Sequence, residues 1–103
     1  MTSATRVPTA AEIPTLAETG VPGYEAVAWL MVVTRAGLPP DILNKLHGEL
    51  KGVLAQPEIK QQIARFGMIP VDSPPPEELR RYVGSETVRW SKIVRQAGAA
   101  GIE

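Results

Sequence analysis

The sequence contains no cysteine, and its 103 residues include one histidine, one phenylalanine and two tryptophans. Without cysteine, disulfides, thiolate nucleophiles and zinc–thiolate sites are excluded, and the composition fits cytoplasm and periplasm equally. Lysine plus arginine equals aspartate plus glutamate, at eleven each, so the formal net charge is zero. A balanced charge provides no long-range field that would attract nucleic acid or an anionic membrane surface.

Long apolar runs are also missing. No run approaches the roughly 20 residues that a membrane-spanning helix requires. Residues 1–6, MTSATR, do not combine a basic region with a long apolar core, so we expect neither an export signal nor a membrane anchor in this chain. Hydrophobic residues make up 44% of the sequence, which together with its length predicts one compact domain.

The residue types that carry catalysis or bind metals are sparse and isolated. His47 lies at the border of an apolar helical stripe, where a structural role is favoured, and no second histidine or cysteine accompanies it. The serines lack a nucleophile-elbow context, and the glycines form no phosphate-binding motif. We therefore predict no enzyme activity, no metal site and no cofactor.

The most informative stretch is residues 26–34, AVAWLMVVT, which contains no charge. Pro22 and Gly23 precede it, and Gly37 and two prolines follow it. A short valine-rich run between turn residues predicts a strand that is buried on both faces. Such a strand needs a sheet beside it and helices over it.

Later segments predict the helices. Apolar residues at helical spacing predict three of them, over residues 41–55, 57–66 and 75–97. Gly67 is expected to end the second helix, and Ser73 is expected to cap the third. Residues 68–72, MIPVD, predict a short edge strand. The predicted fold class is therefore α/β and helix-dominated, with a small sheet packed under three or more helices.

Three further features are polar. Residues 1–11 are small and polar, and they predict a short strand or a frayed arm. Thr15 and Glu18 have capping-box spacing, which predicts a one-turn helix. Glu86, one turn before Trp90, either holds the last helix through a backbone donor or is a solvated surface acid.

A long ordered pattern runs through the chain: EIPTLAETGVPGYE at residues 12–25, then Trp29, Ala36, Gly37, Pro39, Trp90, Ala97 and Gly98. This pattern resembles the carboxyl-terminal third of the Bug-type receptors of tripartite tricarboxylate transporters. The family wording is close to P-D-V-P-T-F-x-E-x-G-x-P-G-Y-E-x-x-x-W, followed by a strand, A-P-A-G-T-P, a helix, D-P-E-V and a last helix with E-x-x-x-W. Gln56 departs from it, since the family has aspartate there.

The resemblance implies a fragment of a periplasmic binding protein-like domain. It implies that residues 1–25 are a remnant of the second lobe and the approach to the hinge, and that residues 26–103 are the carboxyl-terminal part of the first lobe. The implied ligand is a small carboxylated solute, the implied partners are membrane transporter subunits, and the implied compartment is the periplasm. Because family receptors are much longer, we expect the binding site to be incomplete in this chain.

Tyr24 and Trp29 are the ligand-binding candidates. They flank the point where the chain of a family member returns from one lobe to the other, and ligand sites of open α/β folds lie in such crevices. Packing at the hinge or in the core is the alternative role for both, and it is the one that we favour.

The alternative function is structural. An apolar strand without sheet partners is a template for pairing with another chain. The chain would then be a self-associating oligomerisation module without ligand binding, a homo-oligomer in which strands or terminal arms are exchanged. No nucleic-acid partner is expected under either hypothesis.

Overall fold

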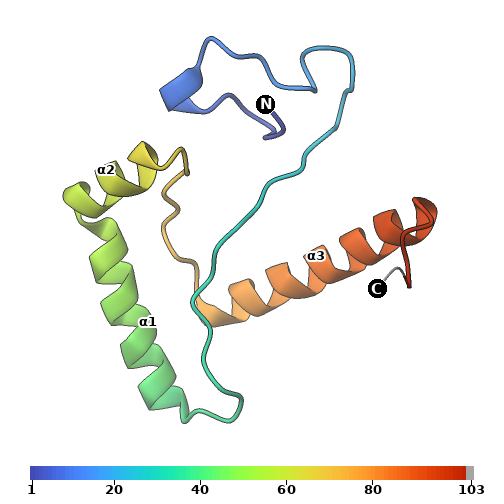
Figure 1. Ribbon diagram of the computed structural model, residues 1–103. Coiled ribbons are helices and arrows are strands. Elements are labelled where there is room, and N and C mark those ends of the chain that lie inside the picture. Colours follow the sequence, from blue (N-terminus) through green and yellow to red (C-terminus); the bar gives the residue numbers. More distant parts are fainter. Residues whose placement is uncertain (102–103) are drawn as a thin grey trace. The chain divides into compact units, whose positions relative to one another are not determined.

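The computed structural model describes residues 1–101 (Figure 1). These residues contain a short 3₁₀ helix, η1 (Pro8–Ala10), and the α-helices α1 (Pro40–Ala55), α2 (Pro57–Arg65) and α3 (Pro76–Gln96). The chain forms two compact units, one over Met1–Val71 and the other from Asp72 onward. Thus α1 and α2 belong to the first unit, and α3 belongs to the second.

The three predicted helices are confirmed, with bounds within a residue or two of those expected. Each begins with proline, whose missing N–H would have no helical partner at that position and whose φ already suits a helix. Acidic residues in the first turns, such as Asp41 and Glu58, interact favourably with the helix dipole. Gly67 follows α2 with φ of 74°, the left-handed conformation expected at a helix stop.

The predicted cap by Ser73 is wrong. Pro75, not Ser73, is the N-cap residue of α3, and it makes no side-chain capping bond. The Ser73 hydroxyl instead lies 3.5 Å from the Pro74 carbonyl oxygen. Consecutive prolines keep the backbone extended up to Pro75, with φ of −56° and ψ of 151°, so the helix starts too far along the chain for Ser73 to cap it.

The predicted small sheet is wrong for residues 1–101, which contain no strand. Residues 26–34 follow an irregular path without a ladder partner, visible as the blue-green trace that leads towards α1 (Figure 1). Residues 68–72 also form no ladder. A strand requires a neighbouring backbone, and the local pattern that favours extended conformation does not supply one. Of the predicted α/β fold, residues 1–101 therefore contain the helices but not the sheet.

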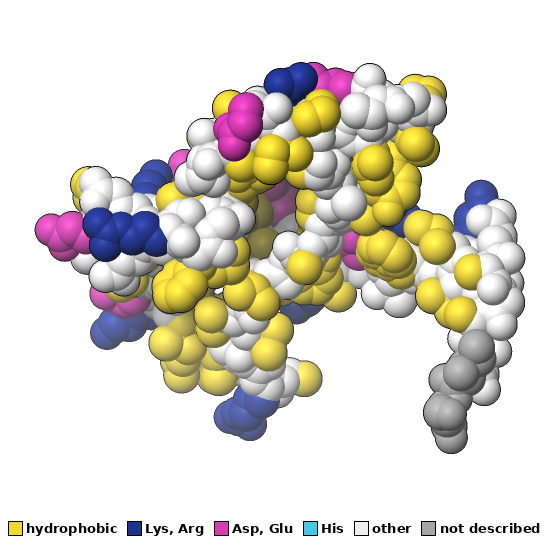
Figure 2. Space-filling model, turned by 45° about the horizontal axis from the view of Figure 1, so that its top comes forward, with side chains coloured by type: hydrophobic (Ala, Val, Ile, Leu, Met, Phe, Trp, Pro, Cys, Tyr) yellow, Lys and Arg dark blue, Asp and Glu magenta, His cyan; other side chains and the backbone are white. Residues whose placement is uncertain are grey.

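Apolar side chains remain accessible throughout the described residues. None of them is fully buried within residues 1–101, and hydrophobic side chains are spread over the visible surface (Figure 2). The face of α1 that was predicted to cover a sheet is half exposed, with Leu46 at 50% and Val53 at 44%. Exposed apolar surface of this extent is typical of regions that contact further polypeptide.

Candidate functional site

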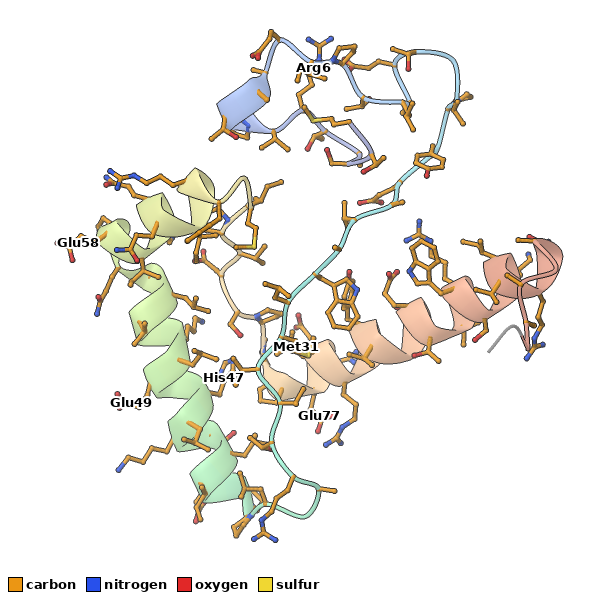
Figure 3. The ribbon with its side chains drawn as sticks, viewed as in Figure 1. Arg6, Met31, His47, Glu49, Glu58 and Glu77 are labelled. Carbon is orange, nitrogen blue, oxygen red and sulfur yellow. The ribbon has the colours of Figure 1, made fainter. Side chains whose placement is uncertain are left out.

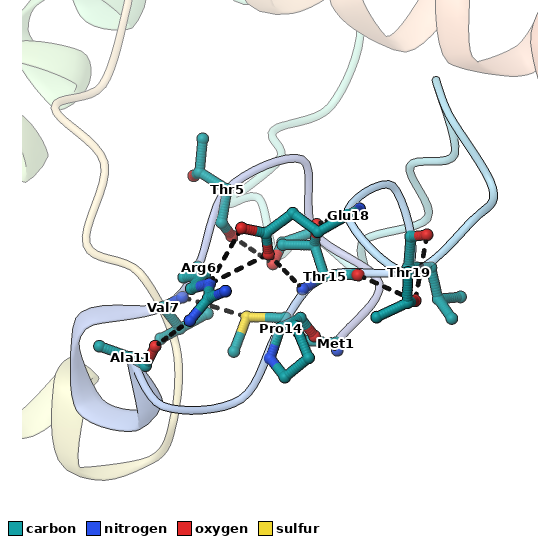
Figure 4. Close-up of polar contacts among 11 residues, drawn as sticks. Met1, Thr5, Arg6, Val7, Ala11, Pro14, Thr15, Glu18 and Thr19 are labelled. Atoms are coloured by element: carbon teal, nitrogen blue, oxygen red, sulfur yellow. Dashed lines mark hydrogen bonds and ion pairs between the residues drawn. The ribbon is translucent and has the colours of Figure 1, made fainter.

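Residues 16–20 form a turn that the side chains of Thr15 and Glu18 hold closed (Figure 4). The Glu18 N–H donates to the Thr15 hydroxyl at 3.2 Å, and the Thr15 N–H donates to Glu18 Oε2 at 2.7 Å. These reciprocal bonds confirm the predicted capping box. The predicted one-turn helix is wrong, because the N–H groups of Thr19 and Val21 both donate to the Leu16 carbonyl and close the chain into a turn.

Arg6 reaches this turn from twelve residues earlier in the sequence. Its Nε lies 3.0 and 3.1 Å from the two carboxylate oxygens of Glu18, and its Nη1 donates to the Ala11 carbonyl at 3.0 Å. Helix η1 lies between Arg6 and Glu18 and changes the direction of the chain. Sequence reasoning missed this ion pair, since no local spacing indicates that the two residues meet. Arg6, Thr15 and Glu18 are called the polar cluster below.

The ion pair makes Glu18 a stronger acid. The hydrogen bond from Arg6, followed by the backbone N–H of Thr15, lowers the pKa of Glu18 from 4.5 to about 2. The side chains of Arg6 and Glu18 are 43% and 47% exposed, so solvent screens their attraction. The polar cluster therefore acts mainly by fixing the geometry of the turn.

Backbone hydrogen bonds tie the first two residues to later positions. The Leu16 N–H donates to the Met1 carbonyl, and the Ala26 N–H donates to the Thr2 carbonyl, each at 2.9 Å. The prediction of a strand or frayed arm over residues 1–11 is wrong, because η1 and these bonds hold the segment in a defined path.

Tyr24 and Trp29, the predicted ligand-binding residues, lie on either side of Ala26. The Tyr24 N–H donates to the Val21 carbonyl at 3.2 Å, which closes a turn with Gly23 at φ of 75°, as in a type II turn. The side chains of Tyr24 and Trp29 are 40% and 41% exposed. Partial exposure fits ligand contact and packing alike, so their role stays a prediction.

A separate polar group lies on α3. Glu86 is 9% exposed and accepts hydrogen bonds from Trp90 Nε1 at 3.0 Å and from Arg89 Nη1 at 3.2 Å. The Arg89 guanidinium lies 5.5 Å from the centre of the Trp90 ring, which is a cation–π distance. The interpretation of Glu86 as a solvated acid is therefore wrong. Its spacing of four residues from Trp90 was the signal available in the sequence.

His47 lies on α1 (Figure 3) and is partly buried. No group of three histidine, aspartate or glutamate side chains within residues 1–101 is placed to hold a metal ion.

Over the same described residues, no helix combines the length and the apolar composition needed to cross a membrane.

Residues 1–99 match the family model described as the tripartite tricarboxylate transporter family receptor. The chain belongs to this family. The resemblance predicted from residues 12–25 and the later tryptophan and glycine positions is therefore confirmed. The family is one of transport receptors, in agreement with the receptor function that the resemblance implies.

Curated relatives show the same similarity over part of their length. A UPF0065 protein from the tcbD-tcbE intergenic region of Pseudomonas sp. is 34% identical over 95 residues, covering 91% of this chain and 28% of the relative. Protein BugT of Bordetella pertussis is 31% identical over 87 residues, covering 84% of this chain and 26% of the relative. The chain thus spans less than a third of the length of these relatives.

The solved structure of R. palustris Rpa4515 with adipate is also similar to this chain. Its TM-score is 0.82 at 33% sequence identity, and the match covers 94% of this chain and 32% of the R. palustris chain. This similarity supports the binding-protein part of the predicted fold class.

Proposed function

We propose that this chain forms part of an extracytoplasmic receptor that delivers a small carboxylated solute to the membrane subunits of a tripartite tricarboxylate-type transporter. The observation that carries the proposal is the TM-score of 0.82, at 33% identity, to a structure solved with adipate, a dicarboxylate. The family match over residues 1–99 supports the same function. Binding rather than catalysis is the proposed activity, and the periplasm is the proposed compartment.

The proposal divides the chain between two lobes. Residues 1–25 belong to the second lobe and the approach to the hinge, and residues 26–103 form the carboxyl-terminal part of the first lobe. Tyr24 and Trp29 then flank the crossing between lobes, where a ligand cleft would lie. The hydrogen bond from Ala26 to Thr2 supports this role, since a fixed backbone lowers the entropic cost of placing both rings against a ligand.

The site is proposed to be incomplete in this chain, because the matching part is 32% of the R. palustris structure. A chimera in which residues 1–99 replace the matching part of that protein tests the function. We expect the chimera to bind adipate or another small dicarboxylate in calorimetric titrations, and the 103-residue chain to show no saturable binding. A chimera that unfolds cooperatively but binds no carboxylate would contradict the receptor function. Saturable binding by the chain alone would contradict the incomplete site.

Alanine substitutions in the chimera test the two aromatic residues. If the two rings contact the ligand, Tyr24→Ala and Trp29→Ala should each weaken ligand binding at least about tenfold, which corresponds to about 1.4 kcal/mol, while the melting temperature without ligand stays the same. Tyr82→Ala is the matched control, since Tyr82 on α3 is 40% exposed like Tyr24. Unchanged affinity with lower melting temperature would instead assign both rings to packing.

A second candidate function is self-association as a structural module. The exposure of residues 26–34 favours it, with Leu30 at 85%, Val32 at 71% and Val33 at 79%. A homodimer or larger assembly, with strands or terminal arms exchanged, would cover these side chains. Light scattering on the purified chain tests the idea, and a monomer throughout the micromolar range would contradict it.

A further inference from the structure

Consecutive hydrogen bonds join the polar cluster to the backbone of Tyr24. Leu16 directly follows Thr15 of the cluster. The Leu16 carbonyl accepts the Val21 N–H at 3.0 Å, and the Val21 carbonyl accepts the Tyr24 N–H at 3.2 Å. A change in the turn that the polar cluster holds closed would therefore displace the backbone from which the Tyr24 ring projects.

The polar cluster also connects the two halves of a closed loop. The Ala26 N–H donates to the Thr2 carbonyl at 2.9 Å, so the ends of the loop formed by residues 2–26 are joined. Arg6 lies on the first half of this loop and Glu18 on the second, and their ion pair at 3.0 Å links the halves (Figure 4). All of these contacts are made within residues 1–26, so they need no further polypeptide.

Arg6 is suited to fixing this loop because it holds two segments at once. Its Nε contacts both oxygens of the Glu18 carboxylate, while its Nη1 donates to the Ala11 carbonyl. The planar guanidinium fixes the direction of these donors. Thr15, which exchanges two hydrogen bonds with Glu18, is 1% exposed, so water competes little for them.

We propose that Arg6 is a positioning residue for ligand binding, which acts through Glu18 to place the Tyr24 ring and the backbone at Ala26. This role rests on the proposed receptor function and adds to it a residue that need not touch the solute. The role holds whether the Tyr24 ring contacts the solute or packs at the hinge, because either requires the ring in a defined place. Groups that are fixed before the solute arrives lose less conformational entropy on binding.

The ion pair between Arg6 and Glu18 contributes more to position than to stability. The two side chains are 43% and 47% exposed, so solvent screens their attraction. Replacing Arg6 should therefore move the Tyr24 ring without unfolding the chain. This difference separates a positioning role from a general structural one.

Fluorine NMR of the whole chain tests the placement of the ring without a ligand. The chain has two tyrosines, so labelling with fluorotyrosine gives one resonance for Tyr24 and one for Tyr82, and Tyr82→Phe assigns them. We expect Arg6→Gln to shift the Tyr24 resonance and to leave that of Tyr82, on α3, unchanged. Arg80→Gln removes the same charge from α3 and should leave the Tyr24 resonance unchanged.

Two results of this measurement would overturn the proposal. One is a Tyr24 resonance that is the same in Arg6→Gln as in the parent chain. The other is the loss of both native resonances in Arg6→Gln, which would show that Arg6 supports the fold as a whole.

Titration of the chimera described above tests the effect on binding, at a temperature where every variant is folded. We expect Arg6→Gln to weaken binding of the dicarboxylate about threefold to tenfold, and Arg80→Gln to leave it unchanged. Glu18→Gln should weaken binding similarly. Adding Arg6→Gln to Glu18→Gln should cause less than about a twofold further loss, because Arg6 acts through Glu18.

The titration distinguishes failure of this role from failure of the receptor function. A parent chimera that binds no dicarboxylate would overturn the receptor function, and with it any role of Arg6 in binding. A parent chimera that binds, with equal affinity in Arg6→Gln, would overturn the positioning role alone. Losses from Arg6→Gln and Glu18→Gln that multiply in the double variant would overturn the action through Glu18.

Discussion

Two neighbouring regions of the chain differ in how much hydrogen bonding fixes them. Residues 1–25 are fixed by many hydrogen bonds, and residues 26–34 by few. In the first region, Glu18 hydrogen-bonds to both Arg6 and Thr15. Backbone hydrogen bonds from later residues also reach the carbonyls of Met1 and Thr2. In the second, most backbone groups have no partner within residues 1–101, and Leu30 is 85% exposed. Polar contacts over three to twelve residues can form within a short segment. An apolar strand, by contrast, gains its stability only from a neighbouring chain or sheet.

The largest expected effect is on the acidity of Glu18. Arg6→Gln should raise the pKa of Glu18 from about 2 towards 4.5, because it removes the charged donor that stabilises the carboxylate. Titration of the carboxyl carbon by NMR measures this change. Arg80→Gln is the control, since Arg80 pairs with Glu77 on α3, 3.6 Å away. Equal Glu18 titration in both variants would contradict the ion pair.

The same ion pair predicts how the turn responds to pH. Because the folded chain lowers the pKa of Glu18, the carboxylate stabilises the turn fully above pH 4.5, and this contribution is lost as the pH falls to about 2. The Thr15 N–H, which donates to Glu18, should lose its protection from hydrogen exchange over this window. In Arg6→Gln, protection of the Thr15 N–H should be lost at higher pH than in the parent chain. If protection of this N–H in the parent chain did not depend on pH, the role of Glu18 would be contradicted.

The next largest effect is expected at Gly23. Its φ of 75° is left-handed, so Gly23→Ala should cost about 1–2 kcal/mol and raise exchange of the Tyr24 N–H about fivefold to thirtyfold. Gly52→Ala, in the interior of α1 with open space for a methyl group, should instead stabilise its helix by about 0.5–1 kcal/mol. Similar effects of both substitutions would show that the turn does not depend on the left-handed residue.

A smaller effect is expected at Thr15, which is 1% exposed. Thr15→Ala removes the hydroxyl that accepts the Glu18 N–H, and loss of such a cap costs about 1 kcal/mol. Exchange of the Glu18 N–H should then rise about fivefold. Thr15→Ser retains the hydroxyl and should exchange like the parent chain.

The smallest effect is expected in the apolar segment, residues 26–34. Leu30→Ser should change local hydrogen exchange in the monomeric chain by less than the equivalent of about 0.5 kcal/mol, because the side chain is 85% exposed. The measurement is made below the concentration at which copies associate. If Leu30→Ser also lowered the hydrogen-exchange protection of the polar cluster, Leu30 would support the turn. The two regions would then not differ in the way described above.

The local features of the chain could be predicted from its residues. Helix bounds followed from prolines and apolar spacing, and the capping box followed from Thr15 and Glu18 at three residues' separation. Family membership followed from a long ordered pattern around residues 12–25. The Arg6–Glu18 pair could not be predicted, because η1 and the following turn, rather than sequence spacing, bring the two side chains together.

What the sequence by itself determined is therefore the helices, the reciprocal turn and the receptor family, since each depends on residues close in the chain or on their order. Only the tertiary structure decided that Arg6 meets Glu18 across twelve residues, and that residues 26–34 form no sheet within residues 1–101. The physical reason is that a helix satisfies its backbone within its own segment, whereas a strand depends on a second backbone that local sequence does not specify.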